Sequence, residues 1–227
     1  MIQLMENMTK TEKIIAALKA HVLEGNLKTG TEFPPEKELA LQLGVGRFSL
    51  REAMRVAEAQ GLIEISRGRR AKVAAPSASA AAEVISLSIR RSRSGLLDLA
   101  EARYVLETHI AWAVAKKITA AEIRKLEKTV QIIGENPNDL DLCVEQDLEF
   151  HGILVRATRN VVFEIMLSPL TELLRESRRE SMGFSITNVV AEHGEIIAAM
   201  KARSPGQAAR CMRRHLEMTI SRQLRRK

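Results

Sequence analysis

Four side chains in the second half of the chain have the chemistry of a metal site. Asp147 and His151 are four residues apart, so on a helix a carboxylate and an imidazole project from one face. His193 and His215 come later, each beside apolar residues that should be buried. If helices bring the four together, three imidazoles and one carboxylate suit a divalent ion such as Zn²⁺, Ni²⁺ or Mn²⁺. On spacing alone, the commoner interpretation of each histidine is a hydrogen-bonded core residue.

A second set of side chains, within the first 75 residues, is basic. Arg47 precedes a predicted helix, Ser49 and Arg51 lie in its first turn, and Arg55 lies one turn further on. A hairpin tip with three arginines, Arg67-Gly68-Arg69-Arg70, follows. A helix can place its N-terminal side chains against base edges in the major groove, which is about 12 Å wide, and a basic hairpin can lie along phosphates. We interpret both segments as DNA-contacting, although Arg55 is better explained as part of a solvated helix face.

The elements that must position these arginines have the order of a winged helix-turn-helix. Thr9 or Thr11 can cap a first helix, and Gly61 ends the helix that follows Arg47. The segments between and after them are a helix over residues 36–43, a Gly44-Val45-Gly46 turn, a helix over residues 49–59, and strands over residues 62–66 and 71–74. Helix, helix, glycine turn, helix and basic hairpin together predict a DNA-binding module.

The remainder of the chain is predicted to be an all-α antiparallel helical bundle. Aromatic residues are only 3% of the chain, which argues against an all-β fold. Thr119 and Glu122 form a capping box, Ser204-Pro205 starts the last helix, and Ser168-Pro169 is expected to interrupt a helix over residues 160–182. The other predicted helices cover residues 96–115, 140–157 and 189–202.

The composition changes once, at the small, uncharged segment Ala74–Ala80, which contains Pro76. We therefore predict a mainly α protein with two domains. Residues 1–76 form the winged helix-turn-helix with its small β-hairpin wing, and residues 77–227 form the helical bundle.

Charge and composition narrow the class of protein. The 227 residues are 45% hydrophobic and 28% charged, as expected for a globular chain, and the net charge of +7 favours a polyanionic partner. The longest apolar runs are far shorter than the ~18 residues that a membrane span needs, and no signal peptide is recognisable. Cys143 and Cys211 form no disulfide framework, so we expect reduced thiols in a cytoplasmic protein.

Residues 27–73 resemble the GntR superfamily of bacterial winged-helix regulators. The residues that carry the resemblance are Gly30, Phe33–Ala40, Leu43–Arg47, Leu50–Met54, Gly61–Ile63 and Gly68. The resemblance implies that Lys37, Arg47, Arg51, Arg67 and Gly68 face DNA. The chain departs from the family pattern at several positions, and these bear on which operator sequence is recognised: Pro35 replaces a small capping residue, Gly46 a Ser or Thr, Phe48 a small or polar residue, and Ser49 a Pro.

The C-terminal part resembles the ligand-binding (FCD) domain of the FadR subfamily. The matching segments begin at Asp98, Asp147, Asn160, Glu192 and Ala208. The resemblance implies a metal ion held by the four residues named at the outset, and an organic-acid effector that completes the coordination of that ion. It also makes Arg103 the best candidate to bind the other end of the acid, with Asn160 and Tyr104 as weaker candidates. Arg103 could instead form a helix-surface pair with Glu107, and Glu192 could either orient a ligand or be simply solvated.

These features predict a ligand-responsive transcription regulator that binds double-stranded DNA as a homodimer on a palindromic operator. Repression is the commoner behaviour in the family, and a small organic-acid or sugar-acid operon is the expected target. Two alternatives remain at this stage. One is a metal-dependent hydrolase that uses the three histidines and the aspartate, and the other is a basic DNA-packing protein without an effector.

Overall fold

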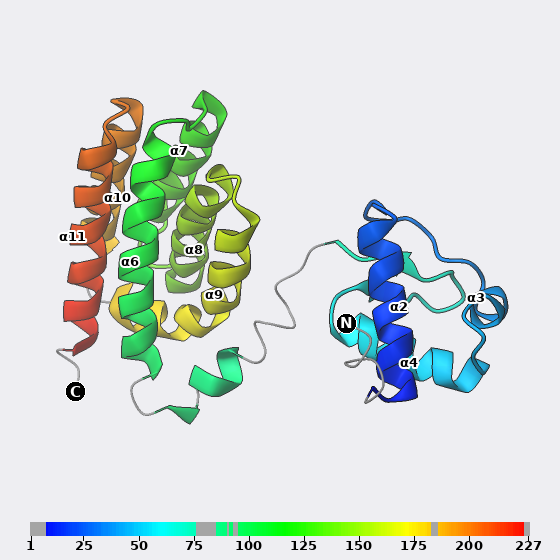
Figure 1. Ribbon diagram of the computed structural model, residues 1–227. Helices are drawn as coiled ribbons and strands as arrows, with labels where there is room; N and C mark the ends of the chain where they lie inside the picture. The colour runs from blue at the N-terminus through cyan, green and yellow to red at the C-terminus, as the bar shows by residue number, and fades with distance from the viewer. Residues whose placement is uncertain (1–7, 76–84, 90, 93–94, 183–185, 225–227) are drawn as a thin grey trace. The chain divides into compact units, whose positions relative to one another are not determined.

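The computed structural model describes residues 8–75, 85–89, 91–92, 95–182 and 186–224, and the chain divides into two compact units over residues 1–80 and 81–227 (Figure 1). Most of the predicted Ala/Ser linker, from residue 76 onward, lies outside the described residues, and so does the predicted domain boundary. Each unit is described on its own below.

The first unit contains three helices and a two-stranded sheet. The helices are α2 (Lys10–Glu24), α3 (Glu36–Gln42) and α4 (Arg47–Ala59), and the strands are β1 (Ile63–Glu64) and β2 (Lys72–Val73). Thr9, rather than Thr11, caps α2, in a capping box with Glu12. The strands are antiparallel, and Ile63 pairs with Val73. Glu32 adds an isolated bridge to Lys72.

The core of this unit lies between α2, α4 and the hairpin. Leu18 of α2 and Leu50 and Ala53 of α4 are almost fully buried, and Phe33 and Ile63 join the same cluster. Gly44, between α3 and α4, has φ of +62°, a conformation that side-chain-bearing residues rarely adopt. After this turn α4 begins with two exposed residues, Arg47 and Phe48, before Leu50 enters the core.

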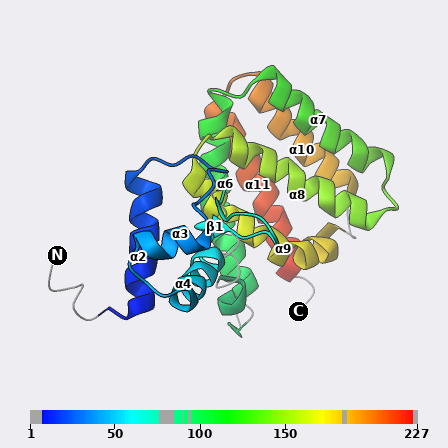
Figure 2. The ribbon, with the colours of Figure 1, turned by 90° about the vertical axis from the view of Figure 1, so that its right-hand side faces the viewer.

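The second unit is a bundle of helices that lie roughly side by side (Figures 1 and 2). Its long helices are α6 (Gly95–Ala115), α7 (Ala120–Glu135), α8 (Leu140–Ala157), α9 (Val161–Met182), α10 (Ile186–Lys201) and α11 (Pro205–Leu224). Helix α6 packs against α11, α7 packs against α8 and α10, and α8 packs against α9. None of the helices in the described part of the chain is both long and apolar enough to cross a membrane.

Local signals place most of these helix ends. The Thr119–Glu122 capping box starts α7, and Pro205 is the first residue of α11. The expected interruption at Ser168-Pro169 is wrong, because α9 continues from Val161 to Met182. A proline inside a helix removes one backbone hydrogen bond, and here it lies within a helix that packs against α8. The prediction of a mainly α protein with a small β-hairpin is confirmed.

Candidate metal centre and nucleic-acid interface

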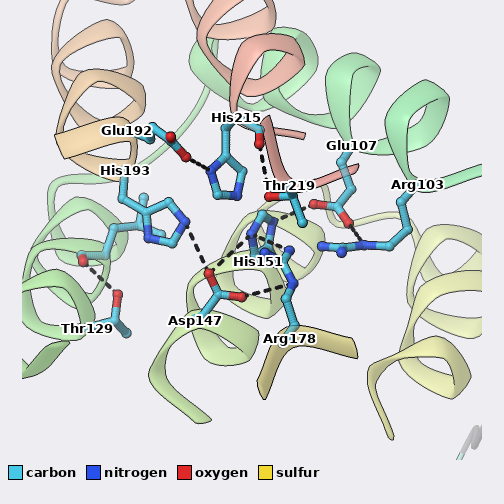
Figure 3. Close-up of polar contacts among 11 residues, drawn as sticks. Arg103, Glu107, Thr129, Asp147, His151, Arg178, Glu192, His193, His215 and Thr219 are labelled. Atoms are coloured by element: carbon cyan, nitrogen blue, oxygen red, sulfur yellow. Dashed lines mark hydrogen bonds and ion pairs between the residues drawn. The ribbon is translucent and has the colours of Figure 1, made fainter. Parts of the chain in front are cut away.

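The structure brings the four candidate metal ligands together inside the second unit (Figure 3). Asp147 and His151 come from α8, His193 from α10 and His215 from α11. Each side chain offers one ligand atom, and these atoms all lie within 4.8 Å of one another. His151 is 6% exposed and the other three are 0% exposed. The set therefore has the donor types and the spacing that a divalent cation requires.

Packing fixes the imidazole rings. The ring of His193 stacks on Phe150, with 3.8 Å between the ring centroids. The rings of His193 and His215 are 4.7 Å apart, and those of His151 and His215 are 5.3 Å apart. Since Phe150 is itself fully buried in the core, the rings have little freedom to turn away from one another.

Two carboxylates orient two of these rings from outside the cluster. Glu107 Oε2 lies 2.5 Å from Nδ1 of His151, and Glu192 Oε2 lies 2.7 Å from Nδ1 of His215. A carboxylate at Nδ1 favours the tautomer that carries its proton there, which leaves the lone pair on Nε2. Histidine ligands are commonly held by such carboxylates. Of the two uses considered for Glu192, the structure therefore supports an orienting contact, made to His215.

Arg178 of α9 is a member of this cluster that the sequence analysis missed. Its Nε lies 3.2 Å from Asp147 Oδ2, and its Nη2 lies 3.1 Å from His151 Nε2. The side chain is 1% exposed. Arg178 lies 27 residues from His151, on a helix that carries several other arginines, and no local pattern distinguishes it from them.

Burial and charge set the protonation of the cluster. Burial lowers the pKa of both His193 and His215 well below the usual value, and neighbouring imidazole and guanidinium charges lower the two pKa values further. Burial alone would raise the pKa of Asp147, but the charge of Arg178 and those of the three histidines together outweigh it, and the net pKa lies below the usual range. Burial and the charge of Arg103 lower the pKa of Arg178 to about 10. At neutral pH the cluster thus has a charged carboxylate at Asp147 beside the neutral imidazoles of His193 and His215.

This donor set fits a metal ion. Nε2 of His193 and Nε2 of His215 are buried, and neither has a hydrogen-bond partner among the described residues. Buried polar atoms normally have a partner, so these lone pairs are unexplained by the protein alone. His193 Nε2 is also 3.4 Å from Asp147 Oδ1, so the imidazole and the carboxylate are close enough to bind the same ion. A cation at that point would satisfy all of them.

A cavity of about 520 Å³ adjoins the cluster. Its lining includes Arg103, Glu107 and His151, together with apolar side chains such as Leu148 and Leu167. This volume is in the range of pockets for small molecules. Arg103 does pair with Glu107, at 2.5 Å, but both side chains are 5% exposed, so the pair is internal and not a feature of the helix surface.

Two weaker candidates for the effector pocket lie elsewhere. Asn160 is exposed, and its Oδ1 accepts a hydrogen bond from the backbone N–H of Val162 at the start of α9. Tyr104 donates its hydroxyl to Glu217. Neither residue is among those that line the cavity beside the cluster. Glu107, which orients His151, is the lining residue whose role the sequence analysis did not identify.

The candidate DNA-contacting side chains lie on the surface of the first unit. Lys37, Arg47, Arg51 and Arg67 are exposed, and Ser49 is half-buried. Arg47 is the first residue of α4 and does not precede the helix as expected. Gly68, in the turn between the strands, has φ of +73° and lets the hairpin reverse tightly.

The first turn of α4 has no acidic residue, and its N-cap Gly46 provides no side-chain hydrogen bond. The amide groups at this end are therefore available for an anion such as a phosphate. Arg51 Nε lies 2.7 Å from Glu36 Oε2 of α3. Arg55 pairs with Glu52 at 3.1 Å on the helix surface, as expected for a solvated face.

Comparisons with known proteins agree in both halves. Residues 10–73 match the family described as bacterial regulatory proteins, gntR family, and residues 98–218 match the FCD domain. The HTH-type transcriptional repressor NanR of Klebsiella aerogenes is 27% identical over 214 residues, which cover 91% of this chain and 82% of that protein. NanR of Edwardsiella tarda is 26% identical over 218 residues, covering 93% of this chain and 84% of that protein.

Solved structures give the same result. The structure of a Streptococcus agalactiae GntR protein is similar with a TM-score of 0.74 and 25% identity, covering 93% of this chain and 99% of that one. The Escherichia coli protein McbR/YncC, with a TM-score of 0.52 and 15% identity over 96% of this chain and 99% of that one, shares the fold. The families that match are families of regulators, so the hydrolase alternative is dropped. The chain therefore belongs to the gntR family of bacterial regulatory proteins, in the FadR-like subfamily with a C-terminal FCD domain, and is a DNA-binding transcription regulator.

Proposed function

We propose that this protein is a homodimeric, cytoplasmic repressor whose affinity for a palindromic operator changes when a small carboxylate binds beside a metal ion in the helical domain. The observation that carries the proposal is the buried cluster of Asp147, His151, His193 and His215 next to a cavity that contains Arg103. Repression is proposed because relatives over most of the chain are named repressors. Residues 1–76 are the proposed DNA-binding domain and residues 77–227 the effector-binding and dimerisation domain.

DNA binding is assigned to α4 and the hairpin. Arg47, Ser49 and Arg51 would reach base edges and phosphates from the first turn of α4, and Lys37, Arg67 and Gly68 would contact the backbone beside it. In a gel-shift titration with operator DNA, we expect Arg51→Ala to weaken binding about 10- to 100-fold, the range for loss of a base-contacting arginine. Arg214→Ala is a matched control, because Arg214 is a similarly exposed arginine of the second unit, paired with Glu195. Wild-type affinity in Arg51→Ala would show that α4 is not the recognition helix.

The metal ion is assigned to the four ligands. A set of three imidazoles and one carboxylate suits Zn²⁺, Ni²⁺ or Mn²⁺, and an ion bound there would polarise and hold a carboxylate of the effector. We expect about one equivalent of divalent metal in protein purified without chelator, and loss of that metal in His193→Gln. Protein that contains no stoichiometric metal, and that is not stabilised by any of the three ions, would contradict this assignment.

The effector is assigned to the cavity. A small organic acid or sugar acid could place one carboxylate at the metal and another polar end against the guanidinium of Arg103, which can form paired hydrogen bonds. A thermal-shift screen of organic acids on metal-loaded protein should find a stabilising ligand, because binding to the folded state raises the melting temperature. That shift should shrink in Arg103→Lys and persist in Arg159→Lys, which changes an exposed arginine paired with Glu122. A shift of the same size in both variants would remove Arg103 from the site.

Dimerisation is assigned to α6 and α9. Val105 and Trp112 on α6 are 63% and 39% exposed, and Val162 and Met166 on α9 are 55% and 45% exposed. The ring of His109 lies between the helices, 5.6 Å from Trp112 and 6.3 Å from Phe163. Clustered exposed apolar side chains of this kind mark interaction surfaces. Sedimentation should show a dimer that Val162→Asp dissociates, whereas Leu23→Asp, an exposed position of α2, leaves it intact.

The two activities are linked thermodynamically. If the acid lowers the affinity for operator DNA by a given factor, DNA must lower the affinity for the acid by the same factor. Measuring both affinities in both states of the protein tests the linkage. A factor of one in both measurements would show that the acid and the DNA do not act on one equilibrium.

A further inference from the structure

Phe48 is a large apolar side chain that is exposed to solvent. It is 78% exposed, at the second position of α4, between Arg47 and Ser49. The buried face of the same helix consists of Leu50, Ala53, Met54 and Ala57. The exposure of Phe48 therefore follows from the register of the helix, which directs this position away from the core.

Two arginines share the helix face of Phe48, and each is paired with a carboxylate: Arg51 with Glu36 and Arg55 with Glu52. Positions 48, 51 and 55 recur at the spacing that places side chains on one helix face, so Phe48 shares its stripe with Arg51 and Arg55. Among the described residues, the first turn of α4 carries no acidic side chain. The first turn therefore adds no negative charge to this face, which suits a polyanionic partner.

We propose that Phe48 is a specificity-determining residue that contacts the 5-methyl group of a thymine in each operator half-site. The inference rests on the proposed function, in which the first turn of α4 lies in the major groove. Among the major-groove edges of the four bases, only that of thymine carries an apolar group, its 5-methyl. Aromatic side chains such as phenylalanine can contact this methyl group. A phenyl ring, which offers neither a hydrogen-bond donor nor a strong acceptor, gains most from that group.

The experiment changes only the methyl group. A preferred operator is selected from a random double-stranded library with the full-length protein, and each thymine of the half-site is then replaced in turn by deoxyuridine. We expect the replacement at one thymine of the half-site to weaken binding about fourfold for each half-site changed. This factor corresponds to about 0.8 kcal/mol, the free energy of burying one methylene-sized group.

The variants assign that loss to Phe48. In Phe48→Ser, thymine and deoxyuridine operators should bind equally well, whereas Phe48→Leu, which keeps an apolar contact, should retain part of the preference. Leu23→Ser removes another exposed apolar side chain of the same unit, 70% exposed, and should keep the full preference. Because Phe48 is exposed, Phe48→Ser should fold normally, as its unchanged circular dichroism would show.

The outcomes separate this inference from the function on which it rests. A selected operator in which no deoxyuridine replacement matters overturns the role of Phe48 and leaves DNA binding by α4 intact. A methyl preference that is undiminished in Phe48→Ser does the same and assigns the methyl to another side chain. If no sequence is enriched at all, both the inference and the proposed operator recognition fail.

Discussion

The protein has two sets of charged side chains, one on the surface of the first unit and one inside the second. Arg51 and Arg178 each contact a carboxylate, at 2.7 Å and 3.2 Å, but their side chains are 62% and 1% exposed. The shorter contact is the weaker one, because exposed ion pairs are screened by water and contribute little to stability. The difference shows that burial, more than distance, decides what a charged contact does in this molecule.

The two environments serve different tasks. The ion pair of Arg51 lies in water, so Arg51 can exchange Glu36 for a phosphate or a base at small cost. In the interior, Asp147 and Arg178 cannot exchange their partners for water, so each depends on the other. Removing Asp147 takes away the carboxylate with which Arg178 forms its buried ion pair, while the guanidinium stays buried.

The sharpest test of the comparison is the removal of one buried charge. Asp147→Asn should destabilise the second unit by about 3–5 kcal/mol, because Arg178 would be left buried without its carboxylate. Urea unfolding of chelator-treated protein measures this effect, and the fluorescence of Trp112, the chain's single tryptophan, reports on that unit.

The matched control changes an aspartate on the same helix. Asp141 is 70% exposed and pairs with Arg179, so Asp141→Asn should stay within about 0.5 kcal/mol of wild type. Equal destabilisation in the two variants would mean that burial does not distinguish the two sets of charges.

The second test uses pH. The pKa values of His193 and His215 are lowered in the folded protein, so below about pH 6.5 the unfolded chain binds protons that the folded chain does not. Stability of the metal-free second unit should therefore fall as the pH falls below about 6.5, by about 1.4 kcal/mol per pH unit for each histidine. The lowered pKa values of Asp147 and Glu107 add a further loss only at more acidic pH, below about 4.

Unfolding curves at pH 7, 6 and 5 measure this dependence. His21→Gln should leave the slope unchanged, since this histidine is exposed and lies in the first unit, outside the cluster. A flat profile in the wild-type protein would mean that water reaches the two buried rings.

A third test concerns the carboxylate behind His215. Glu192→Gln keeps a side-chain oxygen that can accept from Nδ1 but removes the charge, and such changes typically weaken metal binding about 10- to 100-fold. Competition with a chromogenic chelator measures the affinity. Glu195→Gln alters an exposed carboxylate three residues further along α10 and should bind metal as wild type does. A normal affinity in Glu192→Gln would show that the contact to His215 has no influence on the ion.

The smallest expected effect is on the exposed surface. Arg67→Ala should weaken DNA binding only modestly and nearly equally for all sequences, and should lower the salt dependence by about one phosphate contact. Binding measured at several salt concentrations gives this slope. A large, sequence-dependent loss would mean that the hairpin contacts bases. The assignment of base contacts to α4 and of phosphate contacts to the hairpin would then be wrong.

The sequence predicted the exposed side chains of α4 better than the buried charged cluster of the second unit. The positions of Arg47, Ser49 and Arg51 depend on one helix and its register, so a local pattern was sufficient to place them on the surface. The pairing of Asp147 with His151 on one face follows from helical spacing in the same way.

The partners of the buried cluster could not be predicted locally. Glu107 and Arg178 approach His151 from α6 and α9, and only the packing of these helices against α8 selects them from similar neighbours. Asn160 does not line the cavity, and its side chain instead accepts a local hydrogen bond from the backbone of α9. Charge alone does not show which arginine is interior.

The contact between Arg178 and His151 has one more consequence. The Nε2 atom of a neutral imidazole has a single lone pair, and in this structure a guanidinium group already takes it. That lone pair can serve the arginine or an ion, but never both at once. An ion bound at Nε2 of His151 would therefore take the place of Arg178 at that atom, and the guanidinium carried by α9 would have to shift.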